Sequence, residues 1–204
     1  MAGITDYNDL KSTIASYLHR SDLTDMIPDF IQWAETRLRR ELRIRKMLKF
    51  VTTTVTSTDG TVGLPSDFLE VRELYFASNP IQNVQFESPG EFFRTAGVLL
   101  SGETRYFTIL DNEFRFSPIP TEDTLNMLYY AAPPFLSDSQ TSNVFLANCP
   151  DLLLFGSLAE AATYIQDDQA LQRWRAMYDR GLGALQVSDN NSKYPSAPLK
   201  VNAR

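Results

Sequence analysis

The order of apolar and polar residues divides the chain into two helical ends and a strand-rich middle. Apolar residues recur every three or four positions in residues 6–19 and again over about 25–46, the one-sided pattern of an amphipathic helix. The same spacing returns in residues 150–165 and 169–186. We therefore expect two helices before the middle region and two after it, with Thr5 as the N-cap of the first.

The middle region has a different texture, in which β-branched and aromatic residues alternate with polar ones. Strand-like segments span residues 50–57, 71–77, 104–110, 113–117 and 124–131. Turns are expected at the Asp-Gly pair 59–60 and at the Asp-Asn pair 111–112. A serine and a proline at residues 88–89 predict the start of a short helix. We expect an antiparallel meander with that helix over one of its faces.

Together these elements predict an α+β protein. Because four amphipathic helices each need a partner surface, the N-terminal and C-terminal helix pairs are expected to form one helical domain resembling a four-helix bundle. The predicted parts are the first half of this helical domain, the inserted antiparallel β-rich domain, the second half of the helical domain, and an extended C-terminal docking tail. Their respective boundaries are 1–49, 50–146, 147–187 and 188–204.

Composition supports a folded chain with a sizeable core. The chain has 204 residues, of which 43% are hydrophobic and 22% charged, as in an ordinary globular protein. Its single cysteine excludes an intramolecular disulfide. The first ten residues lack the basic and apolar regions of a secretion signal, and no stretch approaches the roughly 18 apolar residues of a membrane span. We therefore expect neither export by a standard signal nor a membrane-embedded segment.

Candidate chemistry is sparse. His19 has no second histidine with which to form a metal site, so a capping or surface role is favoured. Cys149 precedes an apolar helix and is expected to be a buried thiol. Glu35 could form a glycosidase-like pair with Asp29 or Glu41, but these acids alternate with arginines, as on a solvated helix face. No phosphate-binding glycine loop is present. We expect no catalytic residue, no metal and no cofactor.

The most unusual local feature is a run of basic residues between positions 37 and 49, in a chain whose net charge is -6. This basic segment comprises Arg37, Arg39, Arg40, Arg43, Arg45, Lys46 and Lys49. One interpretation is a solvated face with ion pairs from Glu35 to Arg39 and from Glu41 to Arg45. The other is a contact surface for an acidic protein or for phosphates. A spacing of three between Arg37, Arg40 and Arg43 slightly favours the contact surface.

Three segments, taken in order, carry a resemblance to a known family. They are the opening DYNDLKSTIASYLHRSDLTDMIPDFIQWAETRLRRELR, the middle LPSDFLEVRELYF, and the closing CPDLLLFGSLAEAATYIQDDQALQRWRAMYDRGLGAL. The chain resembles the head-to-tail adaptor proteins of tailed bacteriophages, most closely the tail tubular protein A or gatekeeper type of short-tailed phages. The resemblance covers nearly the whole chain and depends on the combination, since each segment alone is only an amphipathic helix or a strand entry.

The resemblance implies a structural subunit of a ring, commonly dodecameric, beneath the portal of the capsid at the head–tail junction. It implies contacts with the portal protein, with a tail or nozzle protein, with neighbouring copies, and with double-stranded DNA that passes without sequence-specific binding. Assembly would take place in the host cytoplasm. The extended tail would insert into the portal, with Tyr194, Pro195, Pro198 and Leu199 as its anchors.

A negative total charge suits a conduit, because each neutralised phosphate strengthens binding to DNA. Two alternatives stay open. One is a cell-wall hydrolase associated with the tail, which needs two nearby carboxylates in a cleft. The other is a DNA-binding module that uses the basic second helix.

Overall fold

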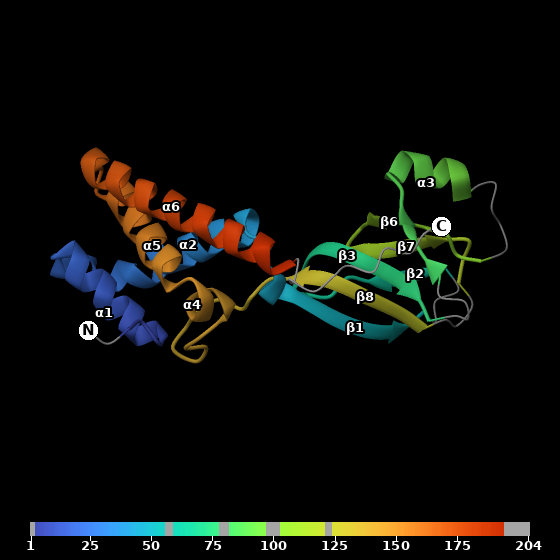
Figure 1. The fold of residues 1–204 in the computed structure, drawn as a ribbon, viewed down its shortest axis with the longest axis horizontal. Helices are drawn as coiled ribbons and strands as arrows, with labels where there is room; N and C mark the ends of the chain where they lie inside the picture. The colour runs from blue at the N-terminus through green and yellow to red at the C-terminus, as the bar shows by residue number, and fades with distance from the viewer. Residues whose placement is uncertain (1–2, 56–58, 78–81, 97–102, 121–123, 194–204) are drawn as a thin grey trace. The chain divides into compact units, whose positions relative to one another are not determined.

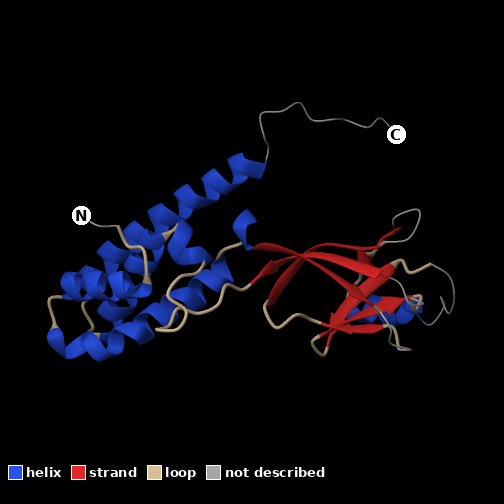
Figure 2. Ribbon diagram, turned by 90° about the horizontal axis from the view of Figure 1, so that it is seen from below, coloured by secondary structure: helices blue, strands red, loops and turns tan. Residues whose placement is uncertain are grey.

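A computed structural model describes residues 3–55, 59–77, 82–96, 103–120 and 124–193. The chain is a mixed α+β protein that divides into two compact units, as predicted for the fold class. Unit 1 combines Met1–Met47 with Pro133–Arg204, and unit 2 comprises Leu48–Ala132. Figure 2 shows that helices dominate the first unit and strands the second.

Unit 1 is built around one central helix (Figure 1). Its elements are α1 (Tyr7–Leu18), the 3-10 helix η1 (Ser21–Met26), α2 (Ile27–Glu41), the 3-10 turn η2 (Arg45–Met47), α4 (Val144–Asn148), α5 (Pro150–Tyr164) and α6 (Asp168–Lys193). Helix α5 packs against α1, α2, α4 and α6. Its buried residues lie all around its circumference. A helix that is apolar on every side is stable only when it has neighbours on every side, and these four helices supply them.

The ends of α1 are capped by polar groups. The side chain of Asp6 accepts a hydrogen bond of 2.8 Å from the backbone N–H of Asp9, so the N-cap is Asp6 and the prediction of Thr5 is wrong. Thr5 instead donates to the carboxylate of Asp9. At the other end His19 is the C-cap, with a left-handed φ of 51°, which agrees with the capping role expected for it.

The periodicity predicted a helix that continues to about residue 46, but helix α2 ends at Glu41. Leu42 has extended backbone angles, and the guanidinium of Arg43 donates to the carbonyl oxygens of Arg39 at 2.8 Å and Leu42 at 2.7 Å. A basic side chain thus satisfies carbonyl groups at the helix C-terminus, where the helix dipole also favours positive charge.

Unit 2 contains two four-stranded sheets. Its elements are β1 (Leu48–Thr54), β2 (Thr61–Gly63), β3 (Phe68–Phe76), β4 (Gln82–Asn83), β5 (Gln85–Phe86), α3 (Pro89–Ala96), β6 (Tyr106–Leu110), β7 (Glu113–Ser117) and β8 (Thr124–Ala131). The strand orders are β1-β8-β3-β4 and β2-β7-β6-β5. Among the strands that the structure describes, β5 and β6 pair in parallel and the other pairs are antiparallel.

A single meander was therefore the wrong topology. Strand β1 pairs with β8, the last strand of the unit, in the register Leu48 to Tyr130, and β2 lies in the other sheet. The tight turn between β6 and β7 is as expected, because Asp111 and Asn112 both have positive φ, at 54° and 64°. Helix α3 packs on β6 and β7, as predicted for a helix that covers a sheet.

The core of unit 2 is rich in aromatic side chains. Phe114 is fully buried and contacts Phe68 and Phe107 edge-on, with ring centroids 5.6 and 5.9 Å apart. Phe68 stacks on Tyr129 at 5.7 Å. Alternate residues of β3, β7 and β8 point into this core, which is the period of two that a half-buried strand requires.

Three expected boundaries differ from the structure, and the first is the start of the β unit, which lies at Leu48 and not at residue 50. Residues 133–146 belong to unit 1 and not to the β region. Helix α6 continues to Lys193, so the tail does not begin at residue 188. The carboxylate of Asp189 accepts a hydrogen bond of 2.8 Å from the backbone N–H of Arg45, which attaches the last turns of α6 to η2. The anchors Tyr194, Pro195, Pro198 and Leu199 lie outside the described residues.

Candidate functional site

The basic segment does not form one face of a helix. The spacing of three predicted one shared helical face for Arg37, Arg40 and Arg43. Arg37 and Arg40 lie on α2, but Arg43 lies beyond its end, so this prediction is wrong. Arg37 forms an ion pair with Glu160 of α5, and its guanidinium lies 5.8 Å from the ring centroid of Tyr178. Arg37 therefore holds α2, α5 and α6 together.

Arg39 is also used inside unit 1. Its guanidinium lies 3.3 Å from the centroid of the Phe135 ring and donates to the carbonyl oxygen of Pro133. Burial lowers the pKa of Arg39, and the nearby carboxylate of Glu35 opposes that shift. Such stacking needs the flat guanidinium, which lysine lacks.

Four members of the basic segment, Arg40, Arg45, Lys46 and Lys49, are more exposed than Arg37, Arg39 and Arg43. Arg40 donates from Nε to the carbonyl oxygen of Thr36 at 3.3 Å. Lys46 donates to the side chain of Asn148, and Lys49 forms an ion pair of 2.7 Å with Asp67. Arg45 follows the end of α2, so it is not one turn beyond Glu41 on the same helix. Glu41 itself accepts a hydrogen bond of 2.7 Å from Tyr178.

The residue that sequence reasoning misassigned is Glu35. It is only 1% exposed, and both of its carboxylate oxygens accept from the backbone N–H of Leu136, at 3.2 and 3.1 Å. The amide of Asn143 donates to Glu35 at 2.6 Å and to the carbonyl oxygen of Pro134 at 2.8 Å. Burial raises the pKa of Glu35, while these hydrogen bonds oppose the shift.

This arrangement gives Glu35 a structural role, because its oxygens accept hydrogen bonds from the segment that follows unit 2. The two acids considered as its catalytic partners have other surroundings. Asp29 is exposed, and Glu41 is bonded to Tyr178. The geometry therefore gives no support to Glu35 as one half of a glycosidase pair, which would need a second carboxylate beside it in a cleft.

The other candidate groups take ordinary structural positions. Cys149 is buried, as expected, and burial raises the pKa of its thiol to about 12. Within the described ranges, no group of three or more His, Cys, Asp or Glu side chains is placed to hold a metal ion. None of the helices in the described part of the chain is long and apolar enough to cross a membrane.

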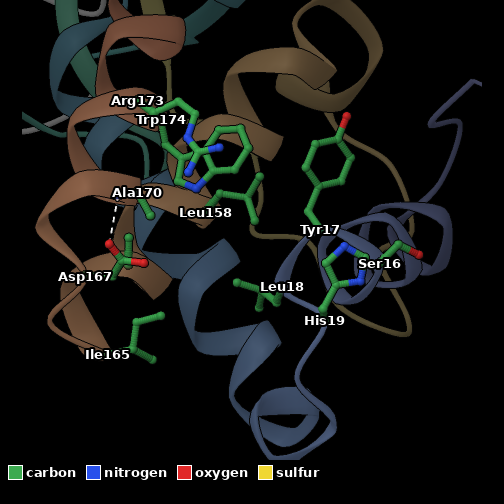
Figure 3. A pocket seen from close by; sticks show the side chains of 11 residues that line it. Ser16, Tyr17, Leu18, His19, Leu158, Ile165, Asp167, Ala170, Arg173 and Trp174 are labelled. Atoms are coloured by element: carbon green, nitrogen blue, oxygen red, sulfur yellow. Dashed lines mark hydrogen bonds between the residues drawn. The ribbon is translucent and has the colours of Figure 1, made fainter.

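A groove of about 560 Å³ lies between the end of α1, the second half of α5 and the start of α6. We call it the α1–α5–α6 groove (Figure 3). Leu18, Leu158 and Ile165 supply apolar lining. Trp174 forms a wall, stacked on Phe155 with centroids 6.0 Å apart.

Two charged side chains lie along one wall of this groove, at the start of α6. Figure 3 shows Arg173 beside Trp174, Asp167 further along the same wall, and Ala170 between them. Tyr17 and His19 of α1 lie across from them. Tyr17 was expected on the buried stripe of its helix, yet it is 48% exposed.

The sequence places the chain in the class of structural adaptors of bacteriophage particles. A model of the family described as SU10 adaptor protein matches residues 5–201, nearly the whole chain. The chain belongs to the SU10 adaptor protein family. The resemblance to phage head-to-tail adaptors is thereby confirmed, and the protein is a component of the virion. No curated protein matches the chain.

Proposed function

We propose that the protein is the subunit of a ring, dodecameric in the simplest case, that binds beneath the portal at the head–tail junction. The ring extends the DNA channel and provides the platform for a tail or nozzle protein. It is assembled in the host cytoplasm and acts as a structural part and not as an enzyme. The observation that carries this proposal is the family match over residues 5–201, which includes both ends of unit 1 and the whole of unit 2.

In this proposal unit 1 acts as a four-helix bundle that packs against neighbouring copies. A rigid body suits that role, and α5 is in contact with every other long helix of the unit. The ion pair of Arg37 with Glu160 and the hydrogen bond of Tyr178 to Glu41 add fixed contacts between α2, α5 and α6. The tail, with Tyr194, Pro195, Pro198 and Leu199 as anchors, is proposed to dock into the portal.

The basic segment is proposed as a contact surface only in part. Arg37, Arg39 and Arg43 are half-buried and contact groups of unit 1. The four more exposed members, Arg40, Arg45, Lys46 and Lys49, are the ones proposed to contact an acidic partner or DNA in the channel. A chain of net charge -6 with so few exposed cations in this segment suits DNA that passes without a strong grip.

The test is reconstitution with the portal protein of the same phage. We expect the purified chain to migrate with the portal ring on a sizing column, and electron microscopy to show an added ring of density on one end of the portal. Two separate peaks at micromolar concentrations of both proteins would contradict the proposal. A chain that cleaved purified cell wall would favour the hydrolase alternative instead.

A further inference from the structure

A second apolar feature of unit 1 is the side chain of Trp33 on α2, which projects from the surface. Trp33 is 44% exposed, which is unusual for so large an apolar ring. Its ring meets the fully buried Phe30 edge-on, with centroids 5.7 Å apart. Phe30 in turn contacts Tyr164 at 5.6 Å, and Tyr164 is 52% exposed. The ring of Trp33 therefore rests on a packed base.

This projecting tryptophan and the α1–α5–α6 groove lie on opposite sides of α5. Leu158 lines the groove, whereas Glu160 lines the hollow beside Trp33. Two residues along an α-helix correspond to a rotation of about 200°, so these two side chains leave α5 roughly 160° apart. A single copy cannot place its own Trp33 in its own groove, but a neighbouring copy can.

Charges flank the tryptophan in an order that complements the groove. Asp29 is four residues before Trp33 and Arg40 seven residues after it, so all three lie along one exposed stripe of α2. The stripe thus reads acid, aromatic, base. Along the start of α6, one wall of the groove presents the base Arg173, then the small Ala170, then the acid Asp167.

From this complementarity we propose that Trp33 of one copy docks in the α1–α5–α6 groove of the next copy, with Asp29 facing Arg173 and Arg40 facing Asp167. The inference rests on the proposed ring and names the surfaces that form it. A contact between two different patches is heterologous, and a heterologous contact forms a ring when its repeated rotation closes. Buried tryptophans of this kind often carry much of the energy of an interface.

The test uses two cysteines in the full-length chain, Trp33→Cys and Ala170→Cys. Ala170 is half-buried in the groove lining, at the start of α6. The native Cys149 is 2% exposed, and its burial keeps the thiol protonated, so it leaves the background low. We expect copper–phenanthroline oxidation to convert the double variant into a ladder of covalent multimers on a denaturing gel.

Matched controls separate this contact from random collision. A mixture of the two single variants should give only dimers, because each chain then carries one reactive position. Pairing Trp33→Cys with Val187→Cys should give no ladder, since Val187 is exposed on α6 about 26 Å along the helix from Ala170. Dimers of Ala170→Cys alone would indicate a groove facing a groove and would overturn the proposal.

The affinity readout is sedimentation of Trp33→Ala. We expect self-association about 30-fold weaker than that of the unmodified chain, with an unchanged thermal transition because the ring is half exposed. Oxidation is carried out on the concentrated chain alone and on the chain mixed with portal. Absence of the ladder from both samples overturns the Trp33 contact, whereas migration with portal separately decides the adaptor role.

Discussion

At the level of single residues, Glu35 shows why a local pattern can mislead. Its position between arginines on α2 is typical of a solvated face, yet its carboxylate accepts from Leu136, which is 101 residues further along the chain. No local signal in the sequence could identify that partner. By contrast, Leu10, Ile14 and Leu38 are fully buried, as their helical spacing predicted, because helix periodicity is itself local.

The raised pKa of Glu35 gives a pH dependence with a definite sign. A folded-state pKa above the value of 4.5 in the unfolded chain means that the native state holds the proton more tightly. The contribution of Glu35 to stability is therefore greatest below pH 4.5 and decreases as the pH rises through the folded pKa. We expect the free energy of unfolding of the native chain to decrease relative to that of Glu35→Gln across this range, measured by urea denaturation.

The control for this experiment is Glu35→Ala, which removes the acceptor for Leu136 and Asn143 altogether. Relative to Glu35→Gln it should cost about 3 kcal/mol at every pH, because neither variant titrates at this position and the alanine leaves buried donors unpaired. Equal pH profiles for the native chain and Glu35→Gln would show that Glu35 does not titrate in this way.

Substitutions at Leu38 and Arg40 compare how much the two sides of α2 contribute to the free energy of unfolding. Leu38 is 0% exposed, so truncation to alanine should cost about 2 to 5 kcal/mol. Arg40→Glu should change the free energy of unfolding by less than about 1 kcal/mol, because exposed charges contribute little. Chemical denaturation compares the two, and binding to portal measures the contact role of Arg40. A large loss of stability in Arg40→Glu would place this side chain in the fold.

At the level of elements, the type of most helices and strands was predictable, but their ends and pairings were not. Strands β7 and β8 have the predicted bounds, since alternation is strong in both. Strands β2, β4 and β5 have only two or three residues, too few to show a period. The pairing of β1 with β8 joins segments separated by the rest of unit 2, so no local pattern encodes it.

Two glycines of α6 report how closely it approaches α5. A Cβ at Gly181 would lie 2.8 Å from Cδ2 of Leu152 and 3.0 Å from the carboxylate of Asp151, whereas a Cβ at Gly183 would meet open space. Gly183→Ala should therefore stabilise the protein by about 0.5 to 1 kcal/mol through helix propensity. Gly181→Ala should destabilise it by about 1 to 2 kcal/mol, since crowding outweighs the same gain. Thermal unfolding of both variants checks the sign; stabilisation by both would mean that α6 adjusts without cost.

The C-terminal segment can be divided at the end of α6. Truncation after Lys193 keeps every helix and strand of the described part in place, so we expect an intact fold and loss of attachment to the portal. Truncation after Val187 also removes Asp189 and its hydrogen bond to Arg45, which should cost about 1 kcal/mol more. Circular dichroism measures the fold and co-sedimentation measures attachment. Undiminished attachment of the shorter chain would show that the tail has no docking role.

At the level of the whole molecule, the family was identifiable from the order of segments because the match extends over residues 5–201. The assembly behaviour is the remaining prediction. The isolated chain should be a monomer or a weak oligomer at micromolar concentration, because association costs each free subunit translational and rotational freedom that contacts with a partner ring must offset. Analytical ultracentrifugation with and without portal measures this. A stable ring of the chain alone would contradict that order of assembly.

The pairing of β1 with β8 has a consequence for how such a protein can change. Because Leu48 lies opposite Tyr130, the chain leaves the helical unit and returns to it through neighbouring strands. A β unit with a different sequence, length or loop set needs only to present its two ends side by side. The helical unit could then keep its contacts with neighbouring proteins while the inserted β unit is replaced by another.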